Sequence, residues 1–198
     1  MEPTAVLELL ERDGVTVRSR HTVRTNPFYE VAARVGCCKL FHPAYMHAYW
    51  SLWSGLRDAR FALIEIGVEK GRSLRLWEEC FPRADVWALD ADPECRRYAS
   101  ARSRVVTGRQ EDPAALARLL EGSGRPTVVV DDGSHVPAHQ EAALRALWPA
   151  LLPGGWYAVE DFAVPFGHGF LRDWSRELDG VDELHYYPDL CVMRKSLT

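Results

Sequence analysis

The segment Phe61-Ala-Leu-Ile-Glu-Ile-Gly-Val-Glu-Lys-Gly71 joins a short apolar run directly to a loop that begins and ends with glycine. The run has the length and composition of a buried strand, and Leu74, Trp77 and Phe81 follow it at helical spacing. A strand, a glycine loop and a helix in this order are typical of a unit whose backbone approaches a ligand closely. The loop is neither a GxGxxG nor a GK[ST] sequence, so it favours an adenosine ligand without phosphates.

Short apolar strands continue to alternate with helical patterns after this unit, which predicts an α/β fold with a parallel sheet. Asp112-Pro113 reads as the N-cap and first turn of one of the helices. The last two strands are close enough along the chain to form an antiparallel hairpin at one edge. The sequence therefore predicts a Rossmann-like, seven-stranded and mostly parallel sheet, with strands at 61–66, 85–90, 103–107, 127–131, 156–161, 183–187 and 190–194.

The residues before Phe61 follow a different pattern, which we interpret as a helical cover or lid (1–60) on a ligand-binding core (61–198). Both belong to one domain. Residues 16–25 are polar without a clear period and predict a loop. The aromatic spacing further on predicts a helix whose face packs on the sheet through Tyr45, Tyr49 and Trp53. A short amphipathic helix is expected near the start, with Thr4 as its cap and Val6, Leu9 and Leu10 on its apolar face.

The composition bounds the class of protein. The 198 residues suffice for one domain with a sizeable core, and a formal net charge of −4 does not favour a nucleic-acid or membrane-surface binder. Five cysteines without zinc-type spacing, and the lack of a secretory leader, indicate reduced thiols in a cytoplasmic protein. No apolar run reaches transmembrane length.

Carboxylates gather at the ends of two expected strands, as Asp131-Asp132 and as Glu160-Asp161. Because neighbouring parallel strands end at the same edge of a sheet, these groups should lie together beside the ligand. Asp132, Glu160 and Asp161 could then hold one hard cation such as Mg²⁺, which would relieve their mutual repulsion. The alternative is that the first two aspartates cap the next helix or bind backbone amides, while Glu160 and Asp161 are solvated.

Two further polar residues fit such a site. Asp90 ends the second strand, where an acidic side chain in a doubly wound sheet reaches the hydroxyls of a ribose. His135 closes the run Asp132-Gly-Ser-His135, and its imidazole can take a proton from an attacking hydroxyl. A neighbouring dication makes that proton easier to remove. His139, one helical turn further on, is interpreted as a structural or surface residue.

The order of these motifs resembles class I S-adenosylmethionine-dependent methyltransferases. More narrowly, it resembles the metal-dependent sugar O-methyltransferases of macrolide and related natural-product pathways, of the mycinamicin and rhamnosyl-tetracenomycin type. The resemblance covers about Gly36 to Asp161, and its specific part combines Asp131-Asp-Gly-Ser-His135 with Glu160-Asp161. The other matching segments are Leu63-Ile-Glu-Ile-Gly-Val68, Gly71-Arg-Ser-Leu74, Trp77, Phe81-Pro82, Asp90, His139-Gln140 and Pro153-Gly-Gly155.

This resemblance implies transfer of a methyl group from S-adenosylmethionine to a hydroxyl of a small natural product, such as a sugar or vicinal diol. It implies Mg²⁺ at Asp132, Glu160 and Asp161, with His135 as the general base. The residues expected to line the cofactor are Glu65, Gly67, Gly71, Ser73, Asp90, Gln110 and Asp131. Those expected along the substrate are His42, Tyr45 and the segment Phe162–Phe170.

The chain departs from the family pattern at two positions where cofactor or substrate contacts are expected. Cys38 stands in place of the aspartate of a Gly-Thr-Asp-Lys element, and Arg109 replaces an acidic residue before Gln110. Two other functions stay open: an N-methyltransferase or cyclase with the same cofactor, and a non-catalytic partner protein with this fold. Aromatic side chains in the cover fit either an interface of a homo-oligomer or a substrate lid.

Overall fold

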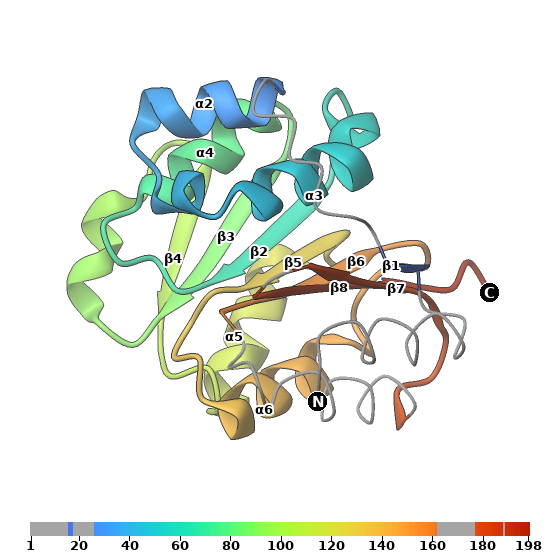
Figure 1. Cartoon of the computed structure of the whole chain (residues 1–198). Coiled ribbons are helices and arrows are strands. Elements are labelled where there is room, and N and C mark those ends of the chain that lie inside the picture. Colours follow the sequence, from blue (N-terminus) through green and yellow to red (C-terminus); the bar gives the residue numbers. More distant parts are fainter. Residues whose placement is uncertain (1–15, 18–25, 162–176, 188) are drawn as a thin grey trace.

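A computed structural model describes residues 16–17, 26–161, 177–187 and 189–198 (Figure 1). Within them, one eight-stranded sheet runs in the order β1-β7-β8-β6-β5-β2-β3-β4. The strands are β1 (Thr16–Val17), β2 (Ala62–Ile66), β3 (Asp85–Asp90), β4 (Ser103–Thr107), β5 (Val128–Asp131), β6 (Trp156–Glu160), β7 (Val181–Tyr187) and β8 (Leu190–Lys195).

The pairing of strands confirms the predicted Rossmann-like sheet. β2 lies parallel to β3 and β5, and β4 and β6 extend the parallel part on either side. β8 is antiparallel to both β6 and β7, which is the predicted hairpin. The strand order reverses between β2 and β5, and in open α/β sheets ligands bind outside the carboxyl ends of the strands at such a point.

One prediction for the N-terminal segment is wrong. Thr16–Val17 forms a strand rather than part of a loop, and it pairs in parallel with His185 and Tyr186 of β7. Two residues are too short to show a period in the sequence, and their pairing depends on the unpaired edge that β7 offers. Residues 18–25 of the predicted loop, and the helix predicted around Val6, lie outside the described residues.

Helices cover both faces of the sheet and create two cores (Figure 1). α2, α3 and α4 lie on one face, and α5 and α6 lie on the other. Side chains along β2 alternate between these layers, so Leu63 joins the first core and Ile64 the second. The helices are α2 (Pro27–Val35), α3 (Pro43–Trp53), α4 (Arg72–Cys80), α5 (Pro113–Ser123) and α6 (Pro137–Leu147), with short 3₁₀ turns η1 (Cys38–Phe41), η2 (Ser54–Leu56) and η3 (Pro93–Tyr98).

Local chemistry explains where several helices begin. Asn26 accepts a hydrogen bond from the Tyr29 amide at the start of α2, and Asp112 caps α5 as predicted. The predicted aromatic face of α3 is also confirmed, because Tyr45, Tyr49 and Trp53 are buried in the first core. In the part of the chain that the structure describes, no helix is both long and apolar enough to cross a bilayer. All five cysteines are unpaired.

The cover shares its core with the sheet, which predicts a single unfolding transition for both. Phe28 of α2 is 1% exposed and packs edge-on against Phe81 and Trp50, whereas Phe41 is 80% exposed. Phe28→Ala should therefore lower the free energy of unfolding by about 3–5 kcal/mol. Phe41→Ala, the same change at an exposed position, should alter it by less than about 0.5 kcal/mol. Denaturant unfolding followed by tryptophan fluorescence and circular dichroism measures both; two separate transitions would contradict a shared core.

Candidate active site

A cavity of about 770 Å³ opens at the carboxyl ends of β2, β3 and β5. Its lining contains part of the predicted site: Gly67, Ser73, Asp90, Gln110, Asp132, His135 and Asp161. Cys38 and Arg109, the two departures from the family pattern, also line it. Of the remaining predicted residues, Glu65, Asp131 and Glu160 are fully buried beside the cavity, and Gly71 turns the chain into α4.

Asp90 fixes the glycine loop at the end of β3. One carboxylate oxygen accepts hydrogen bonds from the backbone amides of Val68 and Glu69, at 2.8 and 3.2 Å. The other oxygen accepts one from the backbone amide of Asp92, at 2.9 Å. The second oxygen can accept a further donor, so the half-buried carboxylate remains able to bind a hydroxyl from the cavity.

The loops after β2 and β5 touch at Gly67. This residue has φ +93°, and a Cβ there would lie only 2.0 Å from the carbonyl oxygen of Asp132. Glycine therefore permits both the turn and the close approach of the two loops. As a result, the expected cofactor side of the cavity lies directly against the carboxylates that follow β5.

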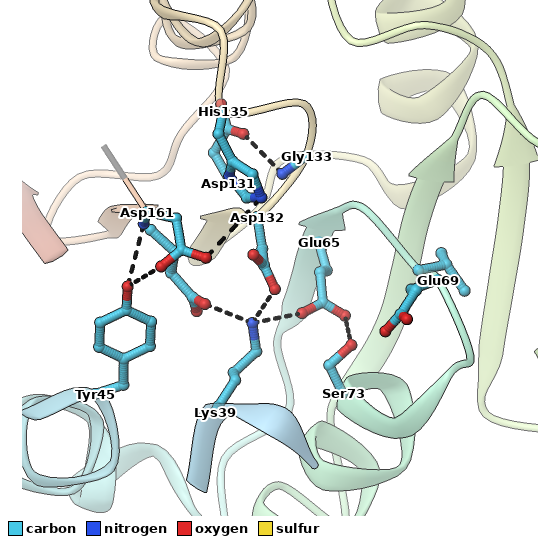
Figure 2. Close-up of polar contacts among 12 residues, drawn as sticks. Lys39, Tyr45, Glu65, Glu69, Ser73, Asp131, Asp132, Gly133, His135 and Asp161 are labelled. Atoms are coloured by element: carbon cyan, nitrogen blue, oxygen red, sulfur yellow. Dashed lines mark hydrogen bonds and ion pairs between the residues drawn. The ribbon is translucent and has the colours of Figure 1, made fainter. Parts of the chain in front are cut away.

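Gln110 of the cavity wall is hydrogen-bonded to the buried Asp131 behind it. Gln110 donates from its amide nitrogen to both Asp131 oxygens, at 3.1 and 3.2 Å, and accepts from the Ser134 amide at 2.6 Å. The Gly133 amide also points at Asp131, at 3.4 Å (Figure 2). For Asp131 the structure therefore agrees with the alternative interpretation, in which this side chain binds a backbone amide. Together with Gln110, Asp131 holds the loop that carries Asp132 and His135.

A lysine that the sequence analysis left without a role lies among the carboxylates. Lys39 of η1 is 1% exposed, and its ammonium contacts Asp132, lies 2.7 Å from Glu160 and lies 3.5 Å from Glu65 (Figure 2). Burial lowers the pKa of Lys39, but the three negative charges outweigh it and raise the pKa well above its usual value. The carboxylates around Lys39 therefore favour its charged form inside the protein.

The two buried glutamates receive their remaining hydrogen bonds from the cover and from α4. Glu65 accepts from the Ser73 hydroxyl at 2.7 Å, and Glu160 accepts from the Tyr49 hydroxyl. Burial raises the pKa of Glu65 to about 7, and burial together with the Asp132 charge raises that of Glu160. Glu160 is not solvated, which rules out that alternative for this residue.

Three side chains converge on the open side of the same cluster. Asp132, His135 and Asp161 each offer a ligand atom, and these atoms lie within 4.8 Å of one another. The His135 Nε2 atom is 3.9 Å from an Asp161 oxygen. This group contains two of the three predicted metal ligands and the predicted base. The third predicted ligand, Glu160, faces Lys39 and Tyr49 instead.

Backbone strain marks this part of the cavity. His135 and Asp161 have φ of 57° and 49°, and Glu69 on the opposite wall has φ of 49°. Residues other than glycine adopt such angles rarely and at a cost of about 1–3 kcal/mol each. Strain of this kind clusters at functional sites, where the surrounding contacts hold it in place.

The predicted substrate residues lie at the cover. The Tyr45 hydroxyl donates to an Asp161 oxygen and lies 3.1 Å from the Asp161 amide, so this buried ring orients Asp161 (Figure 2). His42 stacks on Tyr45 with ring centroids 4.8 Å apart. Their contact with a substrate stays a prediction, and Phe162–Phe170 lies outside the described residues.

Comparisons with known proteins place the chain in a family. The family described as a methyltransferase domain matches residues 64–162, which is half of the chain, and the chain belongs to that family. The matched part runs from within β2 to the end of β6 and contains the glycine loop and the carboxylates Glu65, Asp132, Glu160 and Asp161.

Individual relatives are more specific. The chain is 35% identical over 175 residues to the 8-demethyl-8-alpha-L-rhamnosyl tetracenomycin-C 2'-O-methyltransferase of Streptomyces olivaceus, covering 80% of this chain and 46% of the relative. It is 35% identical over 121 residues to the mycinamicin VI 2''-O-methyltransferase of Micromonospora griseorubida, covering 58% and 30%. The chain therefore spans about half or less of the length of these relatives.

A solved structure agrees with the sequence relatives. The MycE methyltransferase of the mycinamycin biosynthetic pathway, in complex with Mg and SAH, superimposes with a TM-score of 0.75 at 26% identity. The match covers 87% of this chain and 55% of that one. This likeness supports the predicted fold over most of the chain.

The buried Asp131 predicts a specific pH dependence of stability. Burial raises its pKa from 3.8 to about 7, so between these values the folded chain holds a proton that the unfolded chain has lost. The retained proton contributes to the free energy of unfolding. This contribution is fully present below pH 3.8 and is lost as the pH rises through about 7. Asp131→Asn cannot titrate, so the stability of that variant should fall less between pH 5 and pH 8, by on the order of 1.4 kcal/mol for each pH unit between 5 and about 7. Urea unfolding at a series of pH values measures the slope, and identical slopes for both proteins would contradict the assignment.

Proposed function

We propose that the chain is a Mg²⁺-dependent O-methyltransferase that uses S-adenosylmethionine to methylate a hydroxyl of a small acceptor. The observation that carries the proposal is the convergence of Asp132, His135 and Asp161 on the cavity whose other wall holds Gly67 and Asp90. Membership of the methyltransferase-domain family supports the reaction class.

The cavity fits the cofactor in size and chemistry. Pockets of about 300–1,000 Å³ hold small-molecule ligands, and this one lies at the reversal of strand order. Asp90 would bind the ribose hydroxyls, and the glycine loop would lie along the nucleoside. Ser73 and Gln110 would complete the walls, while Glu65 and Asp131 would hold these two residues from behind.

The donor set at the mouth fits a hard cation. Carboxylate oxygens are the ligands that Mg²⁺ prefers, and Asp132 and Asp161 present them to the cavity. Direct ligation by Glu160 stays a prediction, because Lys39 and Tyr49 bind its oxygens here. When bound, S-adenosylmethionine supplies an activated methyl group, and Mg²⁺ lowers the pKa of a coordinated hydroxyl.

His135 is proposed to accept the proton of the acceptor hydroxyl at its Nε2 atom. Its imidazole is exposed, and its Nε2 atom lies 3.9 Å from an Asp161 oxygen, so Asp161 would help to orient the ring. Tyr45 in turn holds Asp161, so the base is supported by a chain of contacts that ends in the core. Holding hydroxyl, base and methyl donor together would supply much of the rate.

A sugar hydroxyl of a natural product is the acceptor that the relatives favour. The curated relatives are named as methyltransferases of a rhamnosyl tetracenomycin and of mycinamicin VI. Location in the cytoplasm, where thiols stay reduced, belongs to the same proposal and is supported by the unpaired cysteines. Assembly into a homo-oligomer and lack of nucleic-acid binding stay predictions. The named relatives are O-methyltransferases, which favours this function over that of an N-methyltransferase or cyclase.

Asp90 should govern cofactor affinity. We expect calorimetric titration with S-adenosylhomocysteine to show micromolar binding that Asp90→Ala weakens by about tenfold to a hundredfold, because charged hydrogen bonds to the ribose are lost. Asp85→Ala is the matched control, since Asp85 begins the same strand at its opposite, exposed end. Lack of binding by the unaltered protein in the presence of Mg²⁺ would refute the proposal.

His135 should govern turnover without affecting cofactor affinity. With a glycoside acceptor found by screening for a gain of one methyl mass on oxygen, His135→Gln should lower kcat by roughly 10²–10⁴-fold. His47→Gln is the control, because His47 lies in α3 away from the cavity lining. Near-normal turnover of His135→Gln would exclude this residue as the base. A product of the unaltered protein methylated on nitrogen would instead show that the chain is an N-methyltransferase.

A further inference from the structure

A buried ammonium lies among the carboxylates of the candidate metal site. The Lys39 side chain reaches from η1 of the cover to the carboxyl ends of β2 and β6 and to the loop after β5. Figure 2 shows its nitrogen with contacts to carboxylates on several sides. Buried charges of this kind need good geometry and additional hydrogen bonds, and removal of one partner is strongly destabilising because it leaves an uncompensated charge.

The surrounding contacts add hydrogen bonds to those that Lys39 supplies. Besides Lys39, Glu65 is bound by Ser73 and Glu160 by Tyr49, so each glutamate has a second polar partner. Without Lys39, three carboxylates would face one another in a space largely closed to water. Such groups repel each other strongly unless they take up protons or another cation.

Asp132 belongs to both groups of residues. One of its oxygens contacts the Lys39 ammonium, and the same carboxylate lines the cavity with His135 and Asp161. A dication bound by Asp132 would therefore lie close to a fixed positive charge. Like charges at such separations oppose each other even in a partly solvated site.

We propose that Lys39 is the internal counter-ion of the carboxylate cluster and competes with the divalent cation for Asp132 and Glu160. This inference rests on the metal part of the proposed function. It assigns Lys39 two linked roles as a positioning residue: it keeps the carboxylates in place while no metal is bound, and it lowers the affinity for the metal. A weakly held cation with open coordination positions suits binding together with the acceptor.

The test compares Lys39→Met with the unaltered protein. Met preserves the length and apolar stem of the side chain and removes its charge. Without divalent cations, Lys39→Met should melt at a lower temperature than the unaltered protein, and Mn²⁺ should raise its Tm by more. In electron paramagnetic resonance titrations, Lys39→Met should bind Mn²⁺ on the order of tenfold more tightly.

Two further variants separate charge from packing. Lys195→Met is the matched control, because Lys195 is a partly buried lysine whose ammonium binds the carbonyls of Trp148, Pro149 and Leu151 outside the site. It should lose stability without any change in Mn²⁺ affinity. The double variant Lys39→Met/Glu160→Gln restores the net charge that the cluster has in the unaltered protein, so metal-free stability should recover relative to Lys39→Met alone.

The outcomes distinguish this inference from the proposed function. Equal Mn²⁺ affinities of Lys39→Met and the unaltered protein would overturn the competition while leaving the metal site intact. If Lys39→Met fails to fold with Mn²⁺ and the double variant fails as well, the role of Lys39 is packing and the inference is wrong. If the unaltered protein binds no Mn²⁺ but binds S-adenosylhomocysteine, the inference and the metal requirement fail together, and the cofactor assignment stands.

Discussion

The contact of one ammonium with three carboxylates sets the arrangement of this site. Lys39 binds side chains delivered by the ends of β2 and β6 and by the loop after β5, which are neighbours in the sheet but far apart in the sequence. Parallel strands that end in acidic residues bring negative charge to one edge by topology alone. A positive charge among these residues offsets their repulsion, and in the described structure that charge comes from the cover.

This dependence makes the cover part of the site. The helix α3 buries Tyr45, Tyr49 and Trp53 in the first core, and two of these rings end in hydroxyls that bind Asp161 and Glu160. Hydrophobic packing thus fixes the position of two hydrogen-bond donors at the carboxylate cluster. The residues that bury the sheet and those that position the carboxylates are the same, so stability and function are coupled through one helix.

The sequence allowed prediction of the parts that depend on local pattern. Strand periods, the glycine loop and the acidic end of β3 follow from spacing within short segments. The position of Lys39 did not follow, because a lysine in a short turn is exposed by default and its partners lie on three other segments. The different environments of Asp131 and Asp132 were harder still: adjacent residues at the end of a strand point to opposite sides, and only the buried Gln110 decides which of them faces the core. The strand at Thr16–Val17 depends wholly on a tertiary edge.

The strained residues show how rigid parts support the reactive ones. His135 and Asp161 lie in loops with φ angles that their own side chains do not favour. Each loop is held by a buried group from elsewhere: Gln110 binds the Ser134 amide next to His135, and the Tyr45 hydroxyl binds the side chain of Asp161. Contacts that preserve an unfavourable backbone must be stronger than the strain they oppose. The buried amide and hydroxyl therefore determine how closely the imidazole approaches the carboxylates, because relaxation of either loop would separate the side chains that now converge on the cavity.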